Sequence, residues 1–291
     1  MNNTMNDKCF VIARKLETLP EGNFPELITD FSLLDGPSIE TFHATAESIF
    51  VNVKTEIPFI SNLRGILIVQ DADFFKAVQG VGSKIGATNV DFESPAVVYA
   101  AVQTWRSEKR FNGVLYIKDS VVENLCRGHK EATATLVHEM AHVHLDNILD
   151  QQYREVTFGV SRAIDLWSEY MAERVALKYY DEKQRRCDNT NICETTLLNN
   201  MAKLQYCSSG GELVSLMREI FSAIGRAMGV SYTTETERNE LVYRLLIINS
   251  NLARMVSELF SIFDTHWGAG SDPIPEVAAI VERHLPKILA R

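Results

Sequence analysis

The stretch Thr135-Leu-Val-His-Glu-Met-Ala-His-Val-His144 contains the pattern His-Glu-x-x-His, between His138 and His142. Uncharged residues surround this pattern, so the stretch predicts a helix that is largely buried. Residues four positions apart on a helix lie one turn apart on nearly the same face. We therefore expect His138 and His142 to direct two imidazole rings at one metal ion, with Glu139 in reach of a metal-bound water. The alternative is a pair of hydrogen-bonded histidines in a core.

A second acidic pattern, Glu169-Tyr-Met-Ala-Glu173, follows at a distance that allows a turn and a returning antiparallel helix. Glu169 is the candidate third metal ligand. Glu173 falls one turn later on the same face, where its carboxylate could accept the N–H of a ligating histidine. The small Ala172 would let the two helices approach each other closely.

An alternative interpretation makes Glu169 and Glu173 part of a solvated stripe that also contains Arg174 and Lys178. The apolar residues of the same segment argue against it, because they indicate that much of this helix is buried. These apolar residues are Trp167, Tyr170, Met171 and Val175.

Together the two patterns resemble the gluzincin class of zinc metallopeptidases, and within it most closely the ImmA/IrrE family of intracellular bacterial and phage regulatory metallopeptidases. The resemblance covers about residues 90 to 182. It implies a zincin-like fold in which His138, His142 and Glu169 bind Zn²⁺ and Glu139 is the catalytic base. It also implies cleavage of a regulatory protein such as a repressor. Two features depart from the family pattern. At position 144 the family usually has an apolar residue where this chain has His144, and the long helical C-terminal region is the second departure.

The predicted fold class is α+β, with a zincin-like catalytic domain over residues 1–186 and an α-helical domain over residues 187–291. The catalytic domain would contain a small, mostly antiparallel sheet and the active-site helix. The polar, turn-rich segment 184–191 suggests the domain boundary. Beyond it, recurring apolar stripes predict a small helical bundle.

Local patterns predict the elements of the first domain. A hairpin would join Ala96–Trp105 to Gly113–Lys118, and its free edge would either bind a substrate as an added strand or simply close the sheet. Further strands are predicted over 48–54 and 65–70. Helices are predicted over 10–16, 72–85, 120–127, 130–146 and 161–183.

Composition limits the classes of function. The net charge of −9 and the pI near 5.4 argue against a general nucleic-acid or anionic-membrane surface, although a local basic groove stays compatible with them. No run of about 18 apolar residues predicts a membrane span, and the N-terminus shows no secretion signal. Five scattered cysteines are typical of reduced thiols, so we expect a cytoplasmic protein.

The predicted chemistry is zinc-dependent hydrolysis of a protein or peptide. Zinc would lower the pKa of its bound water toward about 7, and Glu139 would carry the proton to the leaving amine. Two other interpretations stay open: a zincin-fold module that keeps zinc but docks a partner or nucleic acid, and a zinc hydrolase of non-peptide substrates. The sequence does not choose the oxyanion donor among Tyr153, Tyr170, His144 and His266. Cys126 is either a regulatory fourth ligand or an ordinary half-buried cysteine.

Overall fold

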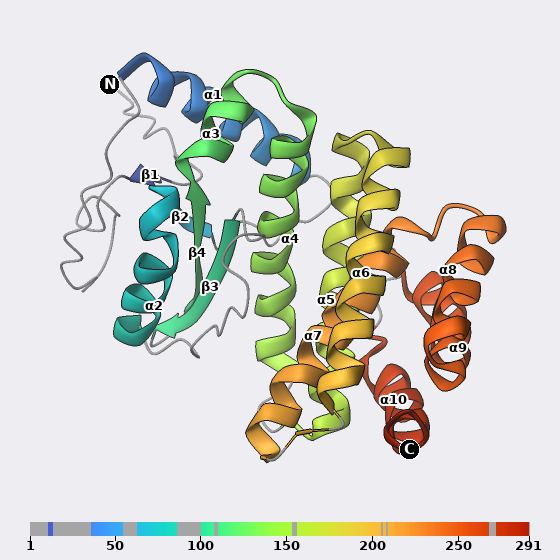
Figure 1. The fold of residues 1–291 in the computed structure, drawn as a ribbon. Helices are drawn as coiled ribbons and strands as arrows, with labels where there is room; N and C mark the ends of the chain where they lie inside the picture. The colour runs from blue at the N-terminus through green and yellow to red at the C-terminus, as the bar shows by residue number, and fades with distance from the viewer. Residues whose placement is uncertain are drawn as a thin grey trace. The chain divides into compact units, whose positions relative to one another are not determined.

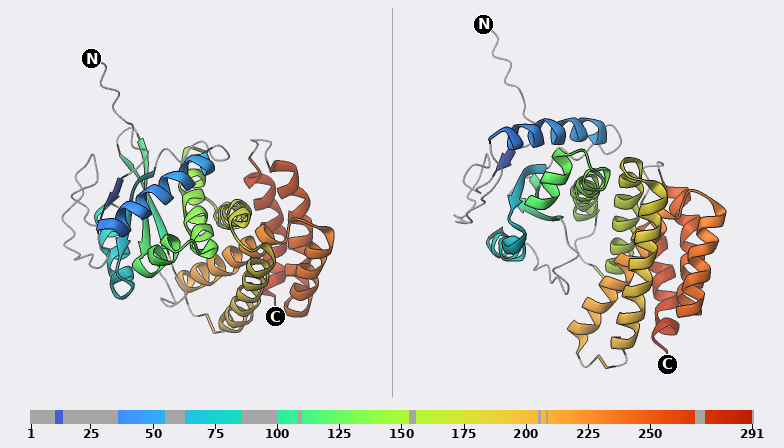
Figure 2. Two further views of the ribbon diagram at one scale, coloured as in Figure 1. Left: turned by 90° about the horizontal axis from the view of Figure 1, so that it is seen from above. Right: turned by 45° about the horizontal axis from the view of Figure 1, so that its top comes forward.

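A computed structural model of the chain describes residues 11–13, 36–54, 63–85, 100–107, 110–152, 156–204, 206–207, 209–267 and 272–290. Contacts between Cα atoms divide the chain into two compact units, Met1–Ile148 and Leu149–Arg291. The domain boundary that the sequence suggested, after residue 186, falls inside a helix of the second unit. Figures 1 and 2 show the described elements as ribbons.

The first unit combines a small sheet with helices, which fits the predicted α+β class. The sheet has the order β1-β2-β4-β3 among the described residues. The elements in chain order are β1 (Val11–Ala13), α1 (Gly36–Lys54), β2 (Leu63–Val69), a 3-10 turn (Asp71–Asp73), α2 (Phe74–Ile85), β3 (Ala100–Ser107), β4 (Arg110–Lys118), α3 (Asp119–Cys126) and α4 (Lys130–Gln152).

The sheet is mixed, so the prediction of a mostly antiparallel sheet is wrong. Strand β2 pairs in parallel with both β1 and β4, and among the described strands only the β3–β4 hairpin is antiparallel. The connection from β2 to β4 includes a helix, α2, and a crossover of this kind lets the chain re-enter the sheet in the same direction. The predicted hairpin itself is confirmed over the residues that the structure describes, and residues 96–99 lie outside them.

The predicted strand over 48–54 is also wrong, because this segment is the end of helix α1. Phe42, Ala46, Ile49 and Val53 are buried and recur every three or four residues, whereas Val51 is 58% exposed. A short window that contains Ile49, Val51 and Val53 alternates like a strand. Only the longer window, which includes Phe42 and Ala46, reveals the helical period.

Near the N-terminus, Val11–Ala13 forms strand β1, where a helix over 10–16 was predicted, and the rest of that segment lies outside the described residues. The predicted helices over 72–85 and 120–127 are confirmed as α2 and α3. Helix α4, which carries His138 and His142, begins at Lys130 as predicted, and it continues to Gln152, beyond the expected end at residue 146.

Helix α4 packs on the sheet through its apolar face. Leu136, Val137, Met140 and Val143 are fully buried. A Cβ atom added to Gly113 of β4 would lie 2.9 Å from Cγ1 of Val143. Because glycine has no side chain, α4 can approach β4 closely at this position. Figure 1 shows α4 beside the hairpin. This packing fixes the face of α4 that carries the two histidines.

The second unit is helical, as predicted for the C-terminal part of the chain. Helices α5 and α6 both pack on α7, α8 packs on α9, and α10 packs on α5 and α9. Figure 2 shows α6 and α7 running side by side. The helices are α5 (Phe158–Ala176), α6 (Glu182–Leu204), α7 (Gly210–Val230), α8 (Glu235–Ile248), α9 (Ser250–His266) and α10 (Ile274–Leu289).

The segment 184–191 lies within α6 and is not the turn-rich linker that the sequence suggested. Three of its polar residues, Arg185, Asn189 and Thr190, lie on the buried face of the helix. Arg185 and Asn189 are each only 8% exposed, and the Asn189 amide donates to the carbonyl of Arg185. A polar face of this kind is stable in a core because each group finds a partner there, and hydrophobic patterning does not detect it.

Aromatic rings hold α5 in the core of this unit. The ring of Tyr170 lies 5.5 Å from that of Trp167 and 4.5 Å from that of Phe263. The guanidinium of Arg174 lies 3.9 Å from the ring centre of Tyr232 and 3.8 Å from that of Trp267. Such contacts add to the hydrophobic burial, so one side of α5 is fixed by ring packing.

Candidate metal site

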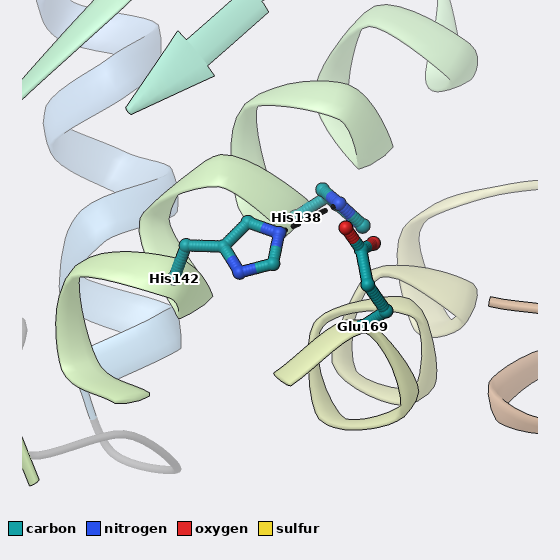
Figure 3. A group of neighbouring side chains, drawn as sticks. All are labelled: His138, His142 and Glu169. Atoms are coloured by element: carbon teal, nitrogen blue, oxygen red, sulfur yellow. Dashed lines mark hydrogen bonds between the residues drawn. The ribbon is translucent and has the colours of Figure 1, made fainter. Parts of the chain in front are cut away.

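The two histidines of the His-Glu-x-x-His pattern face each other on α4, as expected. Their Nε2 atoms lie 3.0 Å apart, and their ring planes are inclined at 79°. His138 is 5% exposed, while His142 is half-buried. Figure 3 shows both rings projecting from neighbouring turns of the helix with the two nitrogens directed at one another.

This spacing fits two ligands of one ion. Tetrahedral zinc with bonds of about 2.0–2.1 Å separates two ligand nitrogens by about 3.3 Å, close to the observed distance between the Nε2 atoms. A metal ion would accept the lone pairs of both nitrogens at once. Glu139 follows His138 directly on α4 and is half-buried. Its place on the helix, next to the face that carries the histidines, is the one expected for a base beside the metal.

In the second unit, Glu169 lies on α5 and is 9% exposed. Arg226 of α7 donates to both of its carboxylate oxygens, from Nε to Oε2 at 2.7 Å and from Nη2 to Oε1 at 3.2 Å. Glu173, one turn later, is 3% exposed, and its Oε2 accepts a hydrogen bond from Nε of Arg185 at 2.7 Å. The burial of both carboxylates rules out the alternative of a solvated acidic stripe.

The helix that carries these glutamates is held against α7 by two glycines. A Cβ atom at Gly225 would lie 2.5 Å from the carbonyl oxygen of Leu166 and 2.9 Å from Cβ of Glu169. At Gly229 it would lie 2.6 Å from the carbonyl oxygen of Tyr170 and 2.8 Å from Cβ of Glu173. The two helix backbones therefore touch where the glutamates stand, which only glycine permits.

Sequence reasoning missed Arg226, Arg185 and the glycine pair. The available signal was the spacing Gly225-x-x-x-Gly229 in a helix with an apolar stripe, since two glycines one turn apart let a partner helix come close. The expected hydrogen bond from a histidine ring to Glu173 stays a prediction; the structure gives this carboxylate the guanidinium of Arg185.

His138, His142 and Glu169 form a group that could bind a metal ion, and each residue offers one ligand atom (Figure 3). Two imidazole nitrogens and one carboxylate oxygen are the donor set of many zinc hydrolases, and three protein ligands leave a fourth position for water. The donor chemistry therefore fits zinc without identifying it.

The four candidate oxyanion donors lie in different surroundings, and two of them have side chains outside the described residues. Tyr170 is fully buried among aromatic rings, and its hydroxyl oxygen accepts a hydrogen bond from Nη1 of Arg174. His266 on α9 has its Nε2 3.3 Å from Oε1 of Glu276. Tyr153 and the side chain of His144 lie outside the described residues. The buried Tyr170 is therefore a core residue of the second unit.

The described cysteines, Cys126, Cys187, Cys193 and Cys207, are thiols, in agreement with the absence of a disulfide framework expected from the sequence. Burial and the charge of Glu123 raise the pKa of the Cys126 thiol. Within the described residues, the thiol of Cys126 is not part of the group of ligand atoms that His138, His142 and Glu169 bring together, so the structure supports the interpretation of Cys126 as an ordinary cysteine.

Comparisons with models of protein families, with curated proteins and with solved structures returned no match for this chain. Within the described ranges, no helix combines the length and the apolar composition needed to cross a bilayer.

Proposed function

We propose that this protein is a zinc metallopeptidase of the gluzincin type, in which His138, His142 and Glu169 hold the ion. The observation that carries the proposal is the pair of histidine Nε2 atoms 3.0 Å apart on one helix, with Glu139 between the two histidines in the sequence. The zincin-like nature of the fold and the kinship with the ImmA/IrrE family are parts of the same proposal.

When bound, zinc would supply a water of lowered pKa and polarise the scissile carbonyl. The chain's own residues do the rest. Glu139 takes the proton of the attacking water and passes it to the leaving amine, because a carboxylate is ionised at rest and can carry a proton briefly. The imidazoles, held by the apolar packing of α4, keep their orientation through this exchange.

A protein or peptide substrate could bind along the sheet. Strand β3 stands at an end of the strand order β1-β2-β4-β3, so one of its sides is an edge of the described sheet. An extended peptide could add to such an edge through main-chain hydrogen bonds, with little demand on its sequence. The substrate class in this proposal is therefore an extended segment of a protein, such as a regulatory protein in the intracellular role that the family resemblance implies.

The test compares wild-type protein with Glu139→Gln. Bound zinc is measured by elemental analysis, and cleavage of a mixed-sequence peptide library is followed by mass spectrometry. We expect one zinc per chain in both proteins and cleavage by the wild type alone. A wild type purified without chelator that lacks zinc would disprove the metal site, and equal cleavage by both would disprove the role of Glu139. Zinc without any cleavage would favour the alternative, a zinc-containing docking module.

A further inference from the structure

Two glutamates stand one helical turn apart on α5, and each is paired with an arginine of another helix. The surroundings of the two pairs differ. Both have an Nε–Oε2 distance of 2.7 Å. The Arg185–Glu173 pair is sealed, with side chains 10% and 4% exposed. In the Arg226–Glu169 pair the arginine side chain is 42% exposed and the glutamate 11%. The first pair is typical of a structural ion pair in a core, whereas the second has a side open to solvent.

The hydrogen bonds of the open pair reach both carboxylate oxygens of Glu169. An ionised carboxylate has about four lone-pair sites, and the contacts with Nε and Nη2 of Arg226 occupy one on each oxygen. The planar guanidinium fork also fixes the plane of the carboxylate, which a single-point donor such as lysine does not do. The Glu169 carboxylate is thus fixed in orientation by Arg226.

We propose that Arg226 is a positioning residue for a metal ligand: it fixes the Glu169 carboxylate in the orientation that binds zinc. This inference rests on the proposed function, because it assumes that Glu169 is a ligand. It makes helix α7 of the C-terminal helical unit a necessary part of the metal site. The glycine at position 225 contributes to the same arrangement, since the contact of its backbone with Leu166 sets Arg226 beside Glu169.

A cation next to a metal ligand also repels the metal, so the two effects compete. Solvent screens this repulsion because the Arg226 side chain is 42% exposed. The two hydrogen bonds from Arg226 to Glu169 keep their fork geometry although the arginine is partly exposed to water. Removing a group that orients a metal ligand typically lowers metal affinity by about 10- to 100-fold. Orientation therefore outweighs repulsion, and removing Arg226 weakens zinc binding.

The experiment measures zinc affinity by competition with a chromophoric chelator, in metal-depleted full-length protein whose helix content is checked by circular dichroism. We expect Arg226→Gln to lose about 10- to 100-fold in zinc affinity and Arg226→Lys to lose less. Arg218→Gln is the matched control: it removes the same charge from an exposed position two turns earlier on α7, and we expect it to leave the affinity unchanged.

A double-variant cycle tests whether Arg226 acts through Glu169. In a Glu169→Gln background, Arg226→Gln should cause no further loss, because the group that it orients is gone. Unchanged or tighter zinc binding by Arg226→Gln would overturn the inference while leaving the metal site intact. If Glu169→Gln itself binds zinc as tightly as the wild type, the proposed ligand set fails instead, so the two failures are distinguishable.

Discussion

The glycine contact between α5 and α7 allows the substitution Gly225→Ala to test the packing on which Glu169 depends. The added Cβ would lie 2.5 Å from a backbone carbonyl oxygen of Leu166, a distance that real Cβ atoms essentially never show. Neither atom is the end of a flexible side chain, so the two helices must move apart. Overpacking of this kind costs about 1–3 kcal/mol.

Part of that cost is offset, because alanine is favoured over glycine inside a helix by about 0.5–1 kcal/mol. We therefore expect Gly225→Ala to lower the free energy of unfolding by about 0.5–2 kcal/mol. The same movement would displace Glu169, so zinc affinity should fall too. Gly229→Ala should destabilise similarly, since its Cβ would lie 2.6 Å from the carbonyl oxygen of Tyr170, but with less effect on zinc because Glu173 is its neighbour.

Denaturant unfolding of the metal-free protein measures the stabilities, and chelator competition measures zinc affinity. Gly211→Ala is the control, because it lies on the same helix and nothing is within 4 Å of the added Cβ. It should be neutral or stabilising by up to about 1 kcal/mol. If Gly225→Ala is as stable as Gly211→Ala and binds zinc as the wild type does, the glycine contact does not position Glu169.

Three further predictions concern the buried pair, a buried thiol and the metal. Arg185→Met leaves the buried carboxylate of Glu173 without its guanidinium, so the free energy of unfolding should fall by about 3–5 kcal/mol in denaturant unfolding, and a neutral effect would contradict the pairing. Burial raises the pKa of the Cys193 thiol from its usual 9.0 to about 12. As the pH rises above 9, the unfolded chain therefore loses this proton before the folded chain does, and the free energy of unfolding should fall. Cys193→Ala should lack that part of the pH dependence. Zinc at 100 times its Kd should stabilise the protein by about 2.7 kcal/mol in thermal unfolding, and His142→Ala should lose this effect.

The sequence predicted the local parts of the site because each depends on a short helical period. The spacing of His138 and His142 fixes their common face once α4 is helical, and the apolar neighbours make α4 a buried helix. The β3–β4 hairpin was predictable because two strand-like runs follow each other in the sequence with a short connection, and the start of α4 because it too depends on neighbouring residues. In each case the signal lies within one continuous stretch of the sequence.

The features that the sequence did not reveal depend on pairing between distant segments. Sheet order was missed because nothing in β2 itself states that β4 will lie beside it in parallel. The ion pairs of Arg185 and Arg226 were missed because each partner lies on another helix, 12 residues away for Arg185 and 57 for Arg226. The polar face of α6 was interpreted as a linker because Arg185 and Asn189 are polar. Both are buried in the fold, where Arg185 pairs with Glu173 and the Asn189 amide donates to the Arg185 carbonyl.

The central claim is that His138, His142 and Glu169 bind one ion. Its most direct test is a crystal structure of the zinc-loaded protein with anomalous diffraction measured at the zinc edge. We predict one strong peak at about 2.0–2.2 Å from Nε2 of His138, Nε2 of His142 and a carboxylate oxygen of Glu169. A peak bonded to the histidines with Glu169 turned elsewhere, or no peak between the two rings, would contradict the account.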